Sequence, residues 1–275
     1  MPNAKTKLTA KTADRYVLYQ ASVQEPDADL DFVDRVFRKA HGKVPTRLRE
    51  DFCGTALTAS RFIQRRATNT AIGVDLDPVP LAWGRKHILS KLSDEQRARL
   101  TLIEGDVLGG PALKASGKVG GVDVILALNF SYWCFHTREV MKRYFEQARA
   151  ALAPGGRFIL DIMVGSDVLV EQTERTRRKG FTYVWEQRRY DPLSGSYTAA
   201  ISFEFATGRA MKDAFVYHWR LWTIPELRDI LREAGFKTIE TYAEGEDAKG
   251  NGTGVYVKMA SCAAERCVLA YVVAG

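Results

Sequence analysis

Apolar and polar positions change their periodicity along the chain, and the changes mark three kinds of predicted structure. Residues 26–41 carry apolar side chains at helical spacing and predict one amphipathic helix. From residue 46 to 163, short apolar runs alternate with helical patterns, which favours a parallel sheet with helices on both faces. From residue 165 to 222 the period becomes two, which predicts an antiparallel insertion with strands at 181–190, 197–205 and 214–222.

The C-terminal part returns to a pattern of helix and strand. The run Thr-Ile-Pro-Glu at 223–226 is typical of a helix start with a capping box, and Gly235 predicts where that helix ends. Strands are expected at 236–242 and 267–273, the second antiparallel to its neighbours. The polar, glycine-rich stretch 244–254 between them predicts a loop.

Four predicted strands of the alternating region end at a polar side chain. Ligands of parallel sheets bind at the carboxyl ends of the strands, so these side chains are expected to line one site. An acid after the second strand can accept two hydrogen bonds from a ribose diol. An acid after the third strand can accept one from an adenine amino group. In chain order, the four residues are Glu50, Asp75, Asp106 and Asn129.

The turn after the first strand separates two classes of adenosine cofactor. A nicotinamide-binding turn needs three glycines to hold a pyrophosphate against a helix N-terminus, whereas this turn retains only Gly54. Phe52 would crowd a pyrophosphate, and Glu50 and Asp51 would repel it. An acidic turn suits S-adenosylmethionine, which carries a sulfonium and an ammonium but no phosphate. The residues therefore disfavour a nicotinamide-dependent reductase.

Two further runs are specific enough to suggest a family. Glu-Gly-Asp-Val at 104–107 follows the third strand, and Leu-Ala-Pro-Gly-Gly-Arg-Phe at 152–158 marks a helix end, a tight turn and a further strand. With these runs, the chain from about Tyr16 to its C-terminus resembles the class I S-adenosylmethionine-dependent methyltransferases of the small-molecule type. That family usually has three alternating glycines after the first acid, of which this chain keeps only Gly54.

The resemblance implies an α/β fold with a domain organisation of three parts. The expected core is a Rossmann-like seven-stranded sheet, mostly parallel with an antiparallel last strand, and flanked by helices. Residues 45–164 and 223–275 would form this cofactor-binding domain. Residues 1–44 would form an N-terminal lid and helix, and residues 165–222 an antiparallel β insertion over the active site that caps the substrate.

The resemblance also implies roles at the cofactor. Glu50 is expected to hold the methionine ammonium, Asp75 the ribose and Asp106 the adenine edge. Asn129 and Phe130 would lie near the sulfonium and the acceptor, and the reaction would leave S-adenosylhomocysteine as its product. The complete set predicted to bind the cofactor is Tyr19, Arg49, Glu50, Cys53, Gly54, Thr55, Asp75, Leu76, Asp106, Val107, Asn129 and Phe130.

Methyl transfer from a sulfonium is an in-line displacement at carbon, in which positioning supplies much of the rate. A neutral amine only has to be oriented, whereas a hydroxyl or an acidic carbon usually needs a base. A lone histidine among aromatic residues is more often structural than catalytic, and Arg220 can hold a substrate carboxylate or pair with a neighbouring acid. Residues predicted to orient or deprotonate the acceptor are Asn129, Tyr132, His136 and His218. Residues predicted to contact the substrate are Tyr16, Trp133 and Arg220.

Composition limits the class of protein, its metal content and its cellular location. The 275 residues are 46% hydrophobic and 27% charged, which is typical of one large soluble domain, and no apolar run approaches the ~20 residues of a membrane span. The four cysteines form no Cys-x-x-Cys pair and there are only four histidines, so no metal site is predicted. Reduced thiols and a cytoplasmic location are expected, for a monomer or a homodimer.

The formal net charge of +7 includes a basic cluster between Arg175 and Arg189, which suits either a nucleic-acid surface or a solvated strand face. The favoured function is methyl transfer to a small molecule, with an amine nitrogen as the favoured acceptor. The alternatives are an O- or C-methyltransferase of a small metabolite, an RNA or protein methyltransferase that uses the basic cluster, and a cofactor-binding regulator without activity. Asn129 is not followed by a Pro-Pro-aromatic run, which disfavours nucleic acid as a partner.

Overall fold

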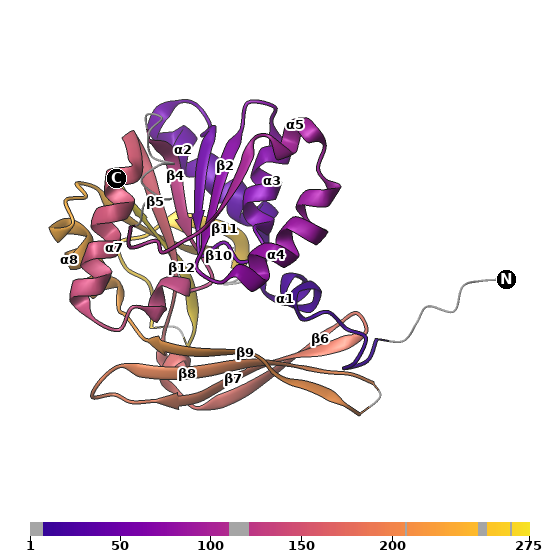
Figure 1. The fold of residues 1–275 in the computed structure, drawn as a ribbon. Helices are drawn as coiled ribbons and strands as arrows, with labels where there is room; N and C mark the ends of the chain where they lie inside the picture. The colour runs from indigo at the N-terminus through magenta and orange to yellow at the C-terminus, as the bar shows by residue number, and fades with distance from the viewer. Residues whose placement is uncertain (1–7, 110–120, 207, 247–251, 265) are drawn as a thin grey trace. The chain divides into compact units, whose positions relative to one another are not determined.

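The computed structural model describes residues 8–109, 121–206, 208–246, 252–264 and 266–275 (Figure 1). They form two compact units. The larger unit is made of residues 25–165 and 223–275, and the smaller unit of residues up to 24 together with 166–222. The boundary falls between Gln24 and Glu25, inside the N-terminal segment that the sequence pattern treats as one part.

The larger unit is built on a mixed sheet of eight strands in the order β11-β10-β12-β5-β4-β1-β2-β3. Strands β1 to β5 pair in parallel, and β12 runs antiparallel between β5 and β10. The predicted α/β class and the antiparallel last strand are confirmed. The strands are β1 (Arg47–Asp51), β2 (Thr70–Asp75), β3 (Leu100–Glu104), β4 (Val122–Ala127), β5 (Leu152–Val164), β10 (Ile239–Glu246), β11 (Gly252–Lys258) and β12 (Val268–Ala274).

This sheet has one strand more than the seven predicted. The eighth strand, β11, pairs antiparallel with β10 and forms the sheet edge. The prediction of a loop at 244–254 is wrong at both ends, which belong to β10 and β11, while residues 247–251 lie outside the described part of the chain. Glycines near the start of β11 conceal the strand-forming run Val255-Tyr256-Val257 that follows them.

Helices cover both faces of the sheet (Figure 1). On one face, α2, α3 and α4 bury apolar side chains in a core that includes Leu48 of β1 and Leu126 of β4. On the other face, Tyr144 and Phe145 of α7 pack edge-on against Phe158 of β5, with ring centroids 5.7 and 5.6 Å apart. The helices are α2 (Pro26–His41), α3 (Leu57–Arg65), α4 (Pro78–His87), α5 (Asp94–Arg97), α7 (Arg138–Ala151) and α8 (Ile224–Glu233), with 3-10 turns η1 (Leu89–Lys91) and η2 (Ser131–Cys134).

Two predicted helices have the ends that their sequences indicate. The helix α2 ends at Gly42, whose φ of 69° is left-handed. The helix α8 begins after Thr223, whose hydroxyl accepts the Glu226 N–H at 3.3 Å, while the Glu226 carboxylate accepts the Thr223 N–H at 2.8 Å. This capping box confirms the predicted start of the helix that leads the chain back into the sheet.

The smaller unit is a four-stranded antiparallel sheet in the order β6-β7-β8-β9, with helix α1 packed on one face. Three strands were expected, and the fourth, β6, is a charged edge strand without apolar alternation. Tyr16 and Tyr19 of α1 pack against Phe215 of β9, with ring centroids 6.0 and 4.9 Å apart. The elements are α1 (Arg15–Val23), η3 (Ser166–Leu169), β6 (Gln172–Arg178), β7 (Phe181–Tyr190), β8 (Ser196–Glu204) and β9 (Ala210–Arg220). Across the described ranges of both units, no helix has the length and apolar character needed to cross a membrane.

Candidate active site

The turns after β1, β2 and β3 meet where the parallel strands of the eight-stranded sheet end. This carboxyl-end edge is called the sheet edge below. Asp75, the last residue of β2, accepts the Gly54 N–H at 2.7 Å on one carboxylate oxygen and the Asp77 N–H at 2.9 Å on the other. Its backbone carbonyl accepts the Gly105 N–H at 2.9 Å. Burial, with the neighbouring carboxylate of Asp77, raises the pKa of Asp75 against the effect of these donors. Asp75 is therefore fixed in orientation, while part of its surface stays accessible to a ligand.

The turn after β1 keeps a glycine-like backbone although it contains one glycine. Phe52, Gly54 and Ala56 have φ angles of 55°, 53° and 59°, so every second residue is left-handed. For L-residues this conformation costs about 1–2 kcal/mol each, which is why glycine is the usual choice. The Phe52 ring packs against Phe135 and Tyr144, at centroid distances of 5.8 and 5.7 Å. A Cβ added at Gly54 would meet no protein atom within 4 Å, so a ligand can approach its backbone.

Replacing Ala56 with Gly is expected to change the free energy of unfolding by less than about 1 kcal/mol, because relief of the left-handed Cβ clash offsets the loss of a fully buried methyl group. Urea unfolding followed by circular dichroism measures this change. As a control, Ala59→Gly in the right-handed interior of α3 is expected to lower the same free energy by about 1 kcal/mol or more. Equal losses of stability in the two variants would contradict the left-handed turn.

Glu50 is a buried acid of β1 whose carboxylate reaches the first turn of α3. Its side chain is 7% exposed, and its carboxylate accepts the Ala59 N–H at 2.8 Å and a hydrogen bond from the Thr58 side chain. Burial, reinforced by the carboxylates of Asp29 and Asp75, raises the pKa of Glu50 to about 8 in spite of these donors. No Lys or Arg of the described chain forms an ion pair with Glu50. A cationic group of a ligand would provide the positive partner that the ionised Glu50 lacks among the described Lys and Arg residues.

Arg49 and Asp51 alternate with Glu50 along β1 and form a buried ion pair. The Arg49 guanidinium donates to both carboxylate oxygens of Asp51, at 2.6 and 2.8 Å, and the Tyr144 hydroxyl of α7 donates to the same carboxylate at 2.9 Å. Arg49 is 2% exposed and Asp51 is 1% exposed. The structure thus gives Arg49 a role in anchoring β1 to α7 in place of the predicted contact with a cofactor.

The turn after β4 holds the predicted residues Asn129 and Phe130. Both have a φ of 56°, and their N–H groups donate to the Asp161 carboxylate at 2.7 and 2.9 Å. The Phe130 ring stacks on Trp133, with centroids 4.9 Å apart. Asn129 and Phe130 are half-buried, so they remain accessible from the same sheet edge as Asp75.

Tyr132 and Trp133 do not fit the roles predicted for them. Both side chains are fully buried, and the Tyr132 hydroxyl donates to the backbone carbonyl of Asp161 at 2.8 Å. Burial raises the pKa of Tyr132 well above its usual range, so the hydroxyl keeps its proton at neutral pH. A packing role beneath the turn replaces the predictions of a catalytic Tyr132 and of a substrate contact through Trp133.

Cys134 belongs to this edge, although no motif in the sequence singles it out. It is exposed by surface area, yet desolvation of the thiol and the carboxylates of Asp106 and Asp75 raise its pKa to about 12. The thiol therefore lies near Asp75 at the end of β2 and Asp106 after β3, and it stays protonated at neutral pH. The turn η2 brings Cys134 to this place, and no local pattern predicts that approach. His136, two residues further along, is exposed, and its role as a base remains a prediction.

The remaining residues predicted to bind the cofactor include exposed and buried side chains. Leu76, directly after β2, is 69% exposed, which leaves an apolar side chain uncovered at this edge. Asp106 is exposed after β3 and accepts the Leu108 N–H at 2.9 Å. The predicted residues with buried side chains, which can meet a ligand through their backbone, are Cys53, Thr55 and Val107.

Four of the predicted residues belong to the smaller unit. Tyr16 and Tyr19 lie on α1, and Tyr16 is 9% exposed. Arg220, the last residue of β9, places its guanidinium carbon 3.8 Å from the ring centroid of Trp222. His218 is exposed on the same strand. Their contacts with a cofactor or substrate remain predictions.

Part of the basic cluster is neutralised within the smaller unit. Arg175 of β6 pairs with Glu204 of β8 at 3.5 Å. Arg188 of β7 pairs with Glu186 at 2.8 Å and also with Asp213. These ion pairs favour a solvated strand face over a nucleic-acid surface.

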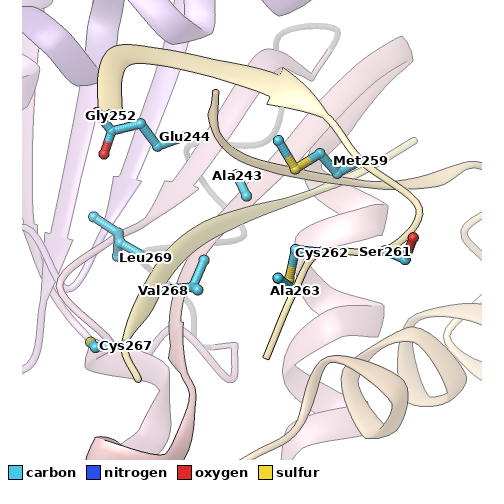
Figure 2. Close-up of a pocket in the computed structure, with 10 residues that line it drawn as sticks. All are labelled: Ala243, Glu244, Gly252, Met259, Ser261, Cys262, Ala263, Cys267, Val268 and Leu269. Atoms are coloured by element: carbon cyan, nitrogen blue, oxygen red, sulfur yellow. The ribbon is translucent and has the colours of Figure 1, made fainter. Parts of the chain in front are cut away.

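A separate hollow of about 530 Å³ opens beside β10, β11 and β12 of the larger unit (Figure 2). Met259, Cys262 and Cys267 bring three sulfur-containing side chains to its lining. Val268, which also lines it, pairs with Val164 at the carboxyl end of β5. The residues that line this hollow include none of those predicted from the sequence.

Solved structures match the chain over nearly its whole length, although no family model and no curated protein matched the sequence. A S-adenosylmethionine-dependent methyltransferase from Clostridium acetobutylicum ATCC 824 is 16% identical, with a TM-score of 0.65 over 94% of this chain and 96% of that chain. An amino pentose methyltransferase from Micromonospora echinaspora is 18% identical, with a TM-score of 0.63 over 94% and 95%. A sugar N-methyltransferase from Streptoalloteichus sp ATCC 53650 is 17% identical, with a TM-score of 0.60 over 100% and 98%. The chain therefore has the fold of the S-adenosylmethionine-dependent methyltransferases.

Proposed function

We propose that the protein is a S-adenosylmethionine-dependent methyltransferase that acts on a small-molecule acceptor. The observation that carries the proposal is the row of polar groups at or just beyond the carboxyl ends of β1 to β4, within a fold that methyltransferases share. Open α/β sheets bind their ligands at this edge. The groups are Glu50, Asp75, Asp106 and Asn129.

The chemistry of this edge fits the cofactor group by group. Asp75 presents an oriented carboxylate to which both ribose hydroxyls can donate. Glu50 is a buried acid that suits the methionine ammonium, because no described Lys or Arg pairs with it. The open space at Gly54 lets the cofactor approach the backbone, and the exposed Leu76 offers an apolar surface to the adenine.

The bound cofactor supplies an electrophilic methyl group, and the protein has to hold the acceptor in line with it. The Asn129 side chain can accept a hydrogen bond from an amine N–H, which would direct the nitrogen lone pair toward the methyl group. Positioning of this kind supplies much of the rate, and a neutral amine needs no base before it attacks. Asn129 is half-buried, as this role requires.

We infer an amine nitrogen as the acceptor atom. A neutral amine needs only to be oriented, a role that the half-buried Asn129 suits, whereas a hydroxyl acceptor would need a base. Tyr132 and Cys134, near the turn after β4, have raised pKa values and keep their protons, which leaves His136 and His218 as the predicted bases. Two solved structures with the same fold are an amino pentose methyltransferase and a sugar N-methyltransferase, which supports an acceptor of this class.

Isothermal titration calorimetry tests the proposal through its first step. Saturable binding of S-adenosylmethionine is expected, with NADH as a control that should not bind, because Phe52 and the acids of the turn oppose a pyrophosphate. Formation of S-adenosylhomocysteine with a panel of amino sugars, and none with their hydroxyl counterparts, is expected next. The proposal fails if no binding is detected at millimolar cofactor.

A further inference from the structure

The turn at Asn129 and Phe130 has a backbone that these two residues do not favour by themselves. Consecutive left-handed residues, both with a φ of 56°, are rare outside glycine and cost about 1–3 kcal/mol each. Such a conformation persists only where surrounding groups hold it. The group that holds this turn therefore decides where both side chains stand at the sheet edge.

Asp161 of β5 is that group. The strands β4 and β5 are parallel neighbours, with Ala127 paired to Leu160, so Asp161 lies beside the point where β4 ends. Its carboxylate accepts the N–H groups of Asn129 and Phe130 at 2.7 and 2.9 Å, one on each oxygen. The side chain is 7% exposed, so solvent does not compete for these two hydrogen bonds.

The surroundings of Asp161 contain acids and phenols but no cationic partner. Asp29 of α2, Tyr271 of β12, Tyr256 of β11 and Tyr132 of η2 act on it electrostatically, and no Lys or Arg of the described chain pairs with it. Burial first, and then Asp29, raise the pKa of Asp161 to about 7 although the two N–H groups lower it. The protonated acid would carry a hydroxyl on one oxygen and would lose one of the two acceptors.

We propose that Asp161 is a positioning residue, whose ionised carboxylate holds the Asn129–Phe130 turn in the conformation that presents both side chains to the cofactor and acceptor. This inference rests on the proposed function. It gives the turn a dependence on pH that the residues of the turn lack by themselves, since neither Asn129 nor Phe130 titrates. Because the ionised Asp161 carboxylate holds the turn, the cofactor is expected to bind more tightly above neutral pH than below neutral pH.

Amide NMR of the ligand-free protein tests the hold without any cofactor. The Asn129 and Phe130 amide signals should shift with a common midpoint near pH 7 in the wild type. In Asp161→Asn, which is uncharged and keeps one carbonyl acceptor, both signals should move and the midpoint should vanish. Signals that stay in place in the variant, or a wild-type turn without this midpoint, would overturn the proposal.

The matched control is Asp123→Asn. Asp123 lies at the amino end of β4, whereas the turn at Asn129 and Phe130 follows the carboxyl end of the same strand. The Asp123 carboxylate also accepts two successive backbone N–H groups, those of Thr46 and Arg47 at 2.9 and 3.0 Å, but it is paired with the Arg47 guanidinium. This variant should leave the Asn129 and Phe130 signals unchanged.

Calorimetry with S-adenosylhomocysteine then tests the positioning role of Asp161 separately from the proposed methyltransferase function. Loss of one hydrogen bond to a charged group is worth about 10-fold or more, so Asp161→Asn is expected to bind about 10-fold more weakly at pH 8, and Asp123→Asn as tightly as the wild type. Equal affinity in the wild type and Asp161→Asn would overturn the positioning role alone. No binding to the wild type would refute the proposed function, while the NMR titration would still decide whether Asp161 holds the turn.

Discussion

Replacing Asp75 with Ala is expected to weaken S-adenosylmethionine binding by about 100-fold or more. The carboxylate would accept two hydrogen bonds from the ribose diol, and hydrogen bonds to a charged group contribute about 1.5–3 kcal/mol each. Asp75 also accepts the Gly54 N–H at 2.7 Å, so the turn after β1 would lose its partner as well. Isothermal titration calorimetry of the wild type and the variant measures this loss.

Two further variants separate the ribose contact from the effect on the turn. Asp75→Asn keeps an oxygen for one donor but loses the charge, so an intermediate loss of about 10-fold is expected. Asp77→Ala removes the exposed N-cap of α4, whose carboxylate accepts the Val79 N–H at 2.8 Å. It should lower the free energy of unfolding by about 1 kcal/mol and leave the affinity unchanged. A loss of twofold or less in Asp75→Ala would refute the ribose assignment.

Glu50→Gln is expected to have opposite effects on binding and on stability. It removes the charge that would face the methionine ammonium, so cofactor affinity should fall by about 10- to 100-fold. It also removes a buried carboxylate that no described cation neutralises, so the ligand-free protein should become more stable at pH 8. A simple structural defect would lower both quantities together.

The pKa of Glu50 determines the pH at which the stability gain is seen. The pKa is about 8 in the folded protein, against an ordinary value of 4.5. Between these values the unfolded chain has lost a proton that the folded protein retains, so stability falls as the pH rises through this interval. Gln does not titrate, so the gain should be absent near pH 4 and should reach about 5 °C in Tm at pH 8. Thermal unfolding of both proteins across this range measures it.

Proton release provides a separate readout of the same residue. An ammonium beside Glu50 favours the ionised carboxylate, so binding should lower its pKa and release protons between about pH 6 and 7.5. Wild-type binding heats should then depend on the ionisation enthalpy of the buffer, and those of Glu50→Gln should depend on it less. Asp29 and Asp161 titrate nearby, with pKa values of about 6 and 7, and the comparison with the variant isolates Glu50 from them. Identical proton release by both proteins would contradict the ammonium assignment.

The elements that the sequence predicts are those with their own local signals. The helix α2 has an apolar stripe and a terminal Gly42, and α8 has a capping box, so both begin and end as expected. The strands β6 and β11 lack such signals. Both are sheet edges, where pairing on one side sets the structure and the sequence is free to be charged or glycine-rich.

At the candidate site, residue type and strand position are enough to bring Glu50, Asp75 and Asn129 to one edge. They are not enough to show which way a neighbouring side chain faces or what it meets. Arg49, one residue before Glu50, turns to the other face and pairs with a buried acid. Cys134 reaches the edge through tertiary packing, for which no local pattern exists.

The backbone of the turn after β1 shows the same limit. Phe52 and Ala56 have the same left-handed backbone as Gly54 between them, and the turn after β4 has a similar backbone held by Asp161. Left-handed φ angles at residues other than glycine are imposed by the groups around them, so a single sequence does not reveal them. In this turn, Phe52 and Ala56 adopt a backbone that glycine adopts most easily, and neighbouring groups have to hold them in it.

A crystal structure of the complex with S-adenosylhomocysteine tests the central claim most directly. Both ribose hydroxyls should lie within hydrogen-bond distance of the Asp75 carboxylate, the ammonium beside Glu50, and the sulfur toward the turn at Asn129 and Phe130. The contrary result would be a ligand bound away from the carboxyl ends of β1, β2 and β4, or at that edge with its ribose turned away from Asp75.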